Sequence, residues 1–467
     1  MRGGLLLSKQ IILKNIFTEY DDSIHGDGNI DPLGMLVIWS GLGREIFSSR
    51  ISSIANDLRS YTVNLLHHAV IKSLIEDSSV NLSKKISSIY HDKNDLKFKQ
   101  SCILMLENIY IFSMIKNSLA DKNVALQGVL GSSNGRKIWE NQSADPKLSF
   151  GVEVKGSQVL VRQLLLGVNG RYKSPMMFLG FFDSNYHYSQ EGGAWEYASE
   201  FIDKNPQLCK LKKNLKDFLV ENILAIDSQK PTIQFSDIPD EVKDSYGINF
   251  STTKHIGSYA TDFWLKITKL DQNAPGALRE LMLANDDLDY SEIIGKAMKK
   301  TDLAPEEKIK LENIYALEPL LSEISQLFSH LLDKKNHTVQ DVEETWHSKW
   351  NRKVRTLNQN ASEIRQHQLQ EINKSVSATA KQRLEKLLLI AEQTSLEKQI
   401  ESLIQYHSEI MQQRGNTAWL RFVDNQIKLF VRPRPLSTKT PDSTTKQWVH
   451  HYYLPEFKRM LDGMGGN

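Results

Sequence analysis

The 95 residues from Leu320 to Arg414 contain neither glycine nor proline. These two residue types interrupt helices most often, because glycine has excess backbone freedom and proline lacks an amide hydrogen. Apolar residues recur at helical spacing through the second half of the interval: Ile364, Leu369, Ile372, Val376, Leu384, Leu387, Ala391, Ile400, Leu403 and Met411. This pattern predicts a long helical hairpin or an extended helix, which we expect to form an interaction surface and not an active site.

With 467 residues the chain exceeds a typical domain, so we expect several domains. Helical spacing predicts an N-terminal helical domain over residues 1–123. The apolar runs "LSFGVEV" and "SQVLVRQLLL", bounded by glycines, predict a β-rich insert over residues 124–190. Residues 191–319 are predicted to be helical, with short helices of the kind found in helix-turn-helix modules. Residues 320–414 form the long helical segment, and residues 415–467 a basic β-hairpin with a short helix. The predicted fold class is mainly α (α+β), with a small central β element and a C-terminal β-hairpin.

Several classes of protein are excluded by what the sequence lacks. The longest apolar stretch, Cys102 to Ile115, is short and carries Glu107, so it predicts a buried helix and not a membrane span. The first residues lack the apolar stretch of a signal peptide. The two cysteines, Cys102 and Cys209, are too few for a disulfide framework or a Cys-rich zinc site. No phosphate-binding or dinucleotide-binding glycine motif occurs. We therefore expect a cytoplasmic protein without membrane association, metal or cofactor.

Positive charge is concentrated in two segments. The formal net charge is +2, but residues 131–173 carry a local +4 and residues 414–459 a local +6. Localised positive charge on an otherwise acidic chain indicates contact with an anionic partner. The alternative is that scattered surface lysines cluster only in sequence.

The motif Asn-Gly-Arg occurs twice, as "NGRK" from Asn134 and as "NGRYK" from Asn169. Asn-Gly favours a tight hairpin turn, because both residues tolerate positive φ. A purely structural turn is the simpler interpretation. A basic hairpin tip can also bind phosphates and stack an aromatic ring on a base. The residues predicted to bind nucleic acid are Arg136, Lys137, Arg171, Tyr172, Lys173, Arg432 and Arg434.

Asp145, Glu153 and Lys155 follow the order Asp…Glu-x-Lys of restriction-endonuclease-like nucleases, where two carboxylates hold Mg²⁺ and a lysine activates water. A strand would place Glu153 and Lys155 on one face. Against a catalytic role, Asp145 precedes a proline in a polar loop, and Lys155 has the position of a solvent-facing hairpin shoulder. We predict that these three residues are not a catalytic centre.

Three further clusters contain residue types that occur in binding sites. His337, Asp341, Glu344 and His347 are expected on adjoining helical turns, an arrangement that can bind a divalent metal, although a solvated helix face is the simpler interpretation. The segment from Asp27 to Asp31 resembles the start of a calcium loop but lacks its glycine and final glutamate. The aromatic run from His450 to Tyr453, beside Trp448, is typical of core packing.

Three stretches together resemble a known group of proteins. They are "DPLGMLVIWSGLGREIF", "VLVRQLLLGVNGRYKSPMMFLGFFD" and "AWLRFVDNQIKLFVRPRP" with the later "WVHHYYL". They are similar in kind to uncharacterised proteins encoded in bacterial antiphage defence islands beside helicase or ATPase genes. The resemblance brings no catalytic residues. It implies a non-enzymatic structural or nucleic-acid-engaging subunit of a defence complex, with other protein subunits and nucleic acid, expected to be DNA, as partners. The alternative is a Mg-dependent nuclease using Asp145, Glu153 and Lys155.

Overall fold

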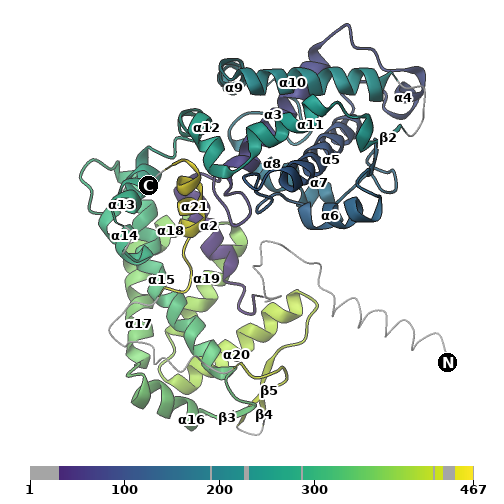
Figure 1. Cartoon of the computed structure of the whole chain (residues 1–467). Coiled ribbons are helices and arrows are strands. Elements are labelled where there is room, and N and C mark those ends of the chain that lie inside the picture. The colour runs from purple at the N-terminus through teal and green to yellow at the C-terminus, as the bar shows by residue number, and fades with distance from the viewer. Residues whose placement is uncertain are drawn as a thin grey trace, which may run out of the picture. The chain divides into compact units, whose positions relative to one another are not determined.

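The structure is a computed structural model that describes residues 31–189, 192–225, 231–285, 288–423, 426–434 and 448–465 (Figure 1). About 65% of it is helical and only 4% is strand, in sheets of two and three strands. The predicted fold class, mainly α with a C-terminal sheet, is confirmed. The calcium-like segment, except for Asp31, lies outside the described residues, as do Asp424 and Asn425.

The chain forms two compact units, and each is assembled from segments that are distant in sequence. Unit 1 consists of Met1–Phe47 and Asn273–Leu454, and unit 2 consists of Ser48–Gln272 and Pro455–Asn467. These units cut across the five segments expected from the sequence, because packing joins stretches that no local pattern connects.

Unit 2 is built around α5 (Leu96–Ala120), which is buried on all sides from Cys102 to Ile115. The buried helix predicted from this apolar stretch is therefore confirmed. The carboxylate of Asp95 caps its first turn and accepts from the amide of Lys97 at 2.7 Å. The other helical elements of unit 2 are α3 (Leu58–Glu76), α4 (Lys84–Ile89), α6 (Ser132–Asn141), α7 (Gln163–Leu166), α8 (Val168–Phe178), α9 (Ala194–Lys204), α10 (Pro206–Leu219), the π-helical turn η1 (Val220–Leu224), the 3₁₀ turn η2 (Phe235–Asp237), α11 (Asp240–Phe250), α12 (Thr253–Thr268) and most of α21 (Leu454–Gly463). Strands β1 (Lys147–Ser149) and β2 (Thr232–Gln234) pair antiparallel.

Unit 1 is organised along α15 (Pro305–Leu331), whose buried residues include Leu317, Leu320 and Ile324. The other helices are α2 (Leu36–Phe47), α13 (Asn273–Ala284), α14 (Tyr290–Ala297), α16 (Val339–Glu343), α17 (Val354–Glu363), α18 (Leu369–Ser375), α19 (Ala378–Ala391) and α20 (Leu396–Gln413), with π-helical turns η3 (Glu344–Lys349) and η4 (Ile364–Gln368). Strands β3 (Asn336–Thr338), β4 (Leu420–Val423) and β5 (Gln426–Leu429) form an antiparallel sheet in the order β3-β5-β4.

A buried carboxylate, Glu318 of α15, holds three distant segments of unit 1 together. Its Oε2 accepts from Trp39 Nε1 at 2.8 Å and from Tyr452 Oη at 2.5 Å. Its Oε1 accepts from Ser322 Oγ at 2.7 Å and from the amides of Val449 and His450 at 2.8 and 3.0 Å. A buried carboxylate with this many donors is well compensated for its loss of hydration. Of the aromatic run from His450 to Tyr453, Tyr452 is part of the core, His450 and Tyr453 are half-buried, and His451 is exposed, so the expected core packing holds only in part.

The predicted β-rich insert is wrong, apart from β1. Asn134-Gly135 lies inside α6 and Asn169-Gly170 lies inside α8, so neither is a hairpin turn. The run "SQVLVRQLLL" ends in α7 and contains no strand, and residues 151–156 form turns.

The physical reason is that these glycines permit close helix packing. A Cβ at Gly135 would lie 2.8 Å from Ile111 Cγ2 and Ile115 Cδ1 of α5. A Cβ at Gly170 would overlap the carbonyl oxygen of Leu165 and lie 2.6 Å from that of Leu164. Glycine serves here as the residue without a side chain, and not as a source of positive φ.

The long hairpin or extended helix predicted for residues 320–414 is also wrong. This interval lies wholly within the described residues. It is largely helical, but it is divided into separate helices and contains one strand, β3. Its breaks use capping hydroxyls in place of glycine or proline. Thr338, Ser377 and Ser395 each precede a helix and accept from its third amide, at 3.1 to 3.3 Å. A search for glycine and proline alone overlooks such boundaries.

Candidate nucleic-acid interface

The first Asn-Gly-Arg motif exposes its charges. Arg136 and Lys137 lie side by side in sequence on α6, and both side chains are exposed. Gly135 faces α5, so the helix turns its basic residues toward solvent. These two predicted residues remain available to an anionic partner.

The second motif faces inward. Tyr172 is 1% exposed, and its hydroxyl accepts from the amides of Asn56 and Asp57 at 3.3 and 2.9 Å. Burial raises the pKa of this hydroxyl. Arg171 Nε donates to the carbonyl of Leu166 at 3.0 Å. The predicted stacking face of Tyr172 is therefore wrong, because the ring serves to hold the start of α3.

Lys173 is likewise committed to its own unit. Its Nζ donates to the carbonyl of Ser184 at 2.7 Å and lies 4.3 Å from the centre of the Tyr186 ring. Partial burial lowers the pKa of this amino group. Of the five residues predicted at the two motifs, only Arg136 and Lys137 offer exposed charge without such packing.

Sequence reasoning missed the polar network that the second motif completes. The amide of Asn169 donates to Glu107 Oε1 at 2.6 Å, and Gln163 Nε2 donates to Glu107 Oε2 at 2.9 Å. Asn169 Nδ2 donates to Tyr186 Oη at 2.8 Å, and its Oδ1 lies 2.9 Å from His68 Nε2. Since an amide oxygen only accepts, His68 carries its proton on Nε2, and Nδ1 accepts from the Tyr188 hydroxyl at 2.9 Å.

The burial of this network indicates a structural role. Burial raises the pKa of Glu107 to about 7 and lowers that of His68 to about 3. Such shifts often mark active sites. Here both side chains are at most 2% exposed, so no substrate reaches them in this structure. The sequence signal that could have found the network is the glutamate inside the apolar stretch of α5.

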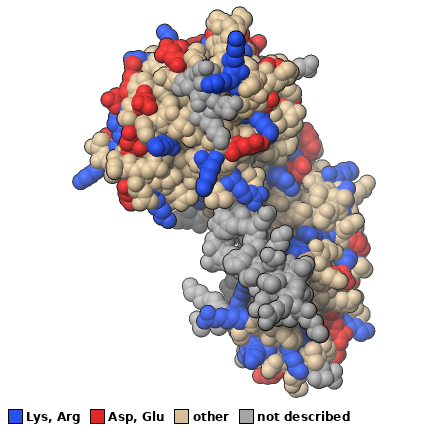
Figure 2. All heavy atoms as spheres, turned by 90° about the vertical axis from the view of Figure 1, so that its right-hand side faces the viewer, with Lys and Arg blue, Asp and Glu red and all other residues tan. Residues whose placement is uncertain are grey.

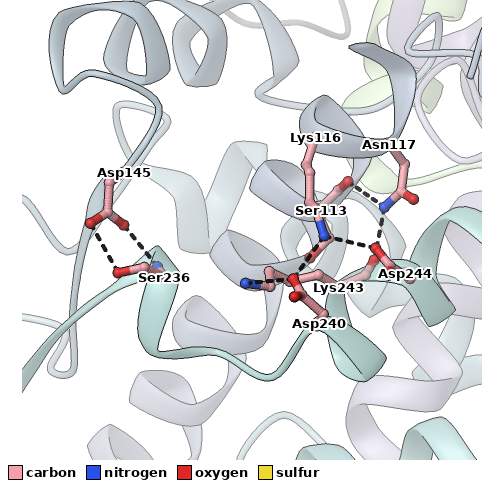
Figure 3. A network of polar contacts seen from close by, with 8 residues as sticks. All are labelled: Ser113, Lys116, Asn117, Asp145, Ser236, Asp240, Lys243 and Asp244. Carbon is pink, nitrogen blue, oxygen red and sulfur yellow. Dashed lines mark hydrogen bonds and ion pairs between the residues drawn. The ribbon is translucent and has the colours of Figure 1, made fainter. Parts of the chain in front are cut away.

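The three residues of the nuclease motif do not form a metal site. Asp145 accepts from the amide and hydroxyl of Ser236 at 2.7 and 3.0 Å (Figure 3). Glu153 forms an exposed ion pair with Lys97 at 2.6 Å, and the Lys97 ammonium lowers the pKa of Glu153. Lys155 is exposed in a turn, so the strand predicted to align it with Glu153 is absent.

Two further carboxylates drawn in Figure 3, those of Asp240 and Asp244, form ion pairs with lysine side chains. Lys116 Nζ lies 2.9 Å from Asp240 and 2.8 Å from Asp244, and Lys243 Nζ lies 3.1 Å from Asp240. In the part of the chain that the structure describes, no three His, Cys, Asp or Glu side chains gather as metal ligands. A carboxylate pair ready to bridge Mg²⁺ is thus not found among these residues.

The histidine-rich segment around β3 also uses its polar groups locally. His337 is buried and accepts the amide of Lys334 at 3.2 Å. Asp341 accepts from the amide and hydroxyl of Thr338, closing a capping box. His347 Nδ1 lies 2.5 Å from the carbonyl of Arg352. These contacts fix the ends of helices.

The three-stranded sheet of unit 1 presents an exposed basic face. In its register, Arg421 of β4 lies opposite Lys428 of β5, which lies opposite Asn336 of β3. Residues directly opposite one another share a face of an antiparallel sheet. The other face is buried through His337, Ile427 and Leu429. The alternation therefore places Arg421, which is exposed, and Lys428, which is half-buried, on the side of the sheet away from Ile427.

An exposed aromatic ring lies beside these basic side chains. Phe430 follows β5, is 58% exposed, and lies with its ring centre 5.4 Å from Arg421 Cζ. Its amide donates to the carbonyl of Trp419 at 2.8 Å, which fixes the backbone beneath the ring. Arg432 follows and is exposed. We call Arg421, Lys428, Phe430 and Arg432 the basic sheet face. In Figure 2, Lys and Arg side chains lie in the lower part of the view, with Asp and Glu side chains among them.

Arg434, the other arginine predicted in this region, has a mixed position. Its side chain is exposed and lies with Cζ 4.9 Å from the ring centre of Trp419. Its amide donates to the carbonyl of Leu332 at 2.9 Å, which attaches this segment to the end of α15. Arg434 therefore helps to fix the segment that carries Arg432.

No family model, curated protein or solved structure matches the chain. None of the helices in the described part of the chain combines the length and hydropathy that a bilayer crossing requires.

Proposed function

We propose that this protein is a non-enzymatic subunit that engages nucleic acid through the basic sheet face. The observation that carries the proposal is the register of the sheet, which sets the exposed Arg421 opposite the half-buried Lys428, away from the buried side of the sheet. A polyanion bound over them gains from both charges.

The chemistry required of this face is electrostatic. Arginine presents a planar set of donors that matches two phosphate oxygens, and lysine adds a point charge. Each neutralised phosphate releases condensed counterions, so affinity falls with salt. The paired strands fix the backbone beneath Arg421 and Lys428, so binding does not require that backbone to be ordered.

The nuclease alternative receives no support from the geometry of Asp145, Glu153 and Lys155, because the two carboxylates are engaged by Ser236 and Lys97. Membership of a defence complex, with a helicase or ATPase as partner, rests on the sequence resemblance alone.

The proposal is tested with the full chain by fluorescence anisotropy on labelled DNA at several salt concentrations. Arg421→Gln/Arg432→Gln should weaken binding and reduce the slope of log affinity against log salt by about 0.7–0.9 for each lost phosphate contact. Arg136→Gln/Lys137→Gln is the matched control, because it removes the same charge from the exposed face of α6 in unit 2.

Loss of binding in the control variant with an unchanged slope in the sheet variant would place the contact on α6. Absence of DNA or RNA binding by the parent chain would reject the proposal altogether.

A further inference from the structure

We infer that the ligand of the basic sheet face is single-stranded nucleic acid, with a base stacked on Phe430. This inference rests on the proposed function and specifies its substrate class. It starts from the ring of Phe430, a large apolar side chain that is 58% exposed and stands on a backbone fixed by the hydrogen bond to Trp419.

An exposed aromatic ring beside arginine matches a base–phosphate unit. The phosphates meet Arg421, Lys428 and Arg432, while the ring offers its π face to a base. Arg421 already covers Phe430 at 5.4 Å, but such a contact is worth only about 0.5–1 kcal/mol at an exposed site. Stacking of a base on an aromatic side chain contributes roughly 1–3 kcal/mol. A base therefore displaces or adds to the arginine contact favourably.

The size and shape of the face favour a single strand over a duplex. Its strands have three or four residues, so each spans about 10–13 Å, the length of a few nucleotides. In a duplex the bases stack on one another and expose only their edges in the grooves, whereas a single strand can unstack a base onto a protein ring.

An acidic protein segment is the competing ligand. Carboxylates would pair with the arginines and the lysine but would gain nothing from the π face of Phe430. The role of the ring thus separates the two ligand classes.

The experiment compares four labelled probes of equal length or charge on the full chain: oligothymidylate, an abasic deoxyribose-phosphate strand, a duplex and an acidic peptide. We expect oligothymidylate to bind most tightly. Phe430→Leu should weaken its binding by about 5- to 150-fold, the equivalent of one lost stack, with an unchanged salt slope. Binding of the abasic strand should not change. Leu389→Ala, at an exposed apolar residue of α19, is the control and should leave all affinities unchanged.

The outcomes distinguish the inference from the proposed function. Equal affinity for the first three probes and no effect of Phe430→Leu would overturn the single-strand inference while the proposed function stands. If the parent chain binds no nucleic acid, both fail. Preferential binding of the acidic peptide would also overturn both and assign the face to a protein partner.

Discussion

At the scale of single residues, Glu107 shows how a charged side chain is accommodated in the core. It accepts hydrogen bonds from Asn169 and Gln163, yet burial outweighs them and raises its pKa to about 7 from an ordinary value of 4.5. The unfolded chain therefore releases this proton at lower pH than the folded chain. The stability that Glu107 contributes is complete below about pH 4.5 and is lost as pH rises through about 7.

Glu107→Gln removes this titration. The stability of the parent relative to the variant should fall by roughly 2–3 kcal/mol between pH 5 and pH 8. Urea unfolding of both proteins across this range measures the difference, and histidines that titrate in the same range cancel in the comparison. A difference independent of pH would show that the carboxyl is not held in its neutral form.

At the scale of elements, the contact of α7 with α8 depends on the missing side chain of Gly170. Gly170→Ala should destabilise unit 2 by about 1–3 kcal/mol, because the new Cβ meets the backbone of Leu164 and Leu165, which cannot rotate away. Better helix propensity offsets at most about 1 kcal/mol.

Ser174→Ala is the matched control, since Ser174 is exposed on the same helix and its loss should change stability by less than about 0.5 kcal/mol. Thermal unfolding of both variants makes the comparison. Equal melting temperatures would contradict the assignment of Gly170 to helix packing.

The elements also show what local pattern can predict. The buried helix α5 and the hairpin of β4 and β5 were predicted correctly. Burial on all sides produces an unbroken apolar run, and burial of one face of a strand produces apolar residues at alternate positions, so both can be recognised from the local sequence. The Asn-Gly motifs were wrongly predicted to be hairpin turns. Gly135 and Gly170 are required because a Cβ would clash with neighbouring helices, and the local sequence does not reveal those neighbours.

Only part of the candidate site could be predicted from the sequence. Positive charge near Arg432 was visible in the sequence, whereas the part played by Arg421 and Phe430 depends on strand register, which joins β3 to β5 across many residues. Tyr172 was assigned to the surface, because nothing local reveals that its hydroxyl binds the start of α3.

At the scale of the whole molecule, each compact unit depends on contacts between distant segments, and Glu318 is the clearest case. Glu318→Ala would leave the donors of Trp39 and Tyr452 buried without their acceptor. Each such group costs about 1–3 kcal/mol, so unit 1 should lose at least about 2 kcal/mol. Hydrogen exchange should then accelerate in α2 and α15 while α5 of unit 2 keeps its protection.

Glu318→Gln provides the comparison, since it retains one acceptor oxygen and should show a smaller loss. Uniform acceleration of exchange in both units, or none, would contradict the role of Glu318 as the centre of unit 1.

The contacts of Glu318 also set an order of events during synthesis. The ribosome completes Trp39 279 residues before Glu318, and the amide of Val449 follows another 131 residues later. Until Glu318 is synthesised, the indole of Trp39 in α2 has no carboxylate to bind. By that point all of Ser48–Gln272 has been synthesised. The larger segment of unit 2 can therefore begin to fold while the first helix of unit 1 still waits for its partners.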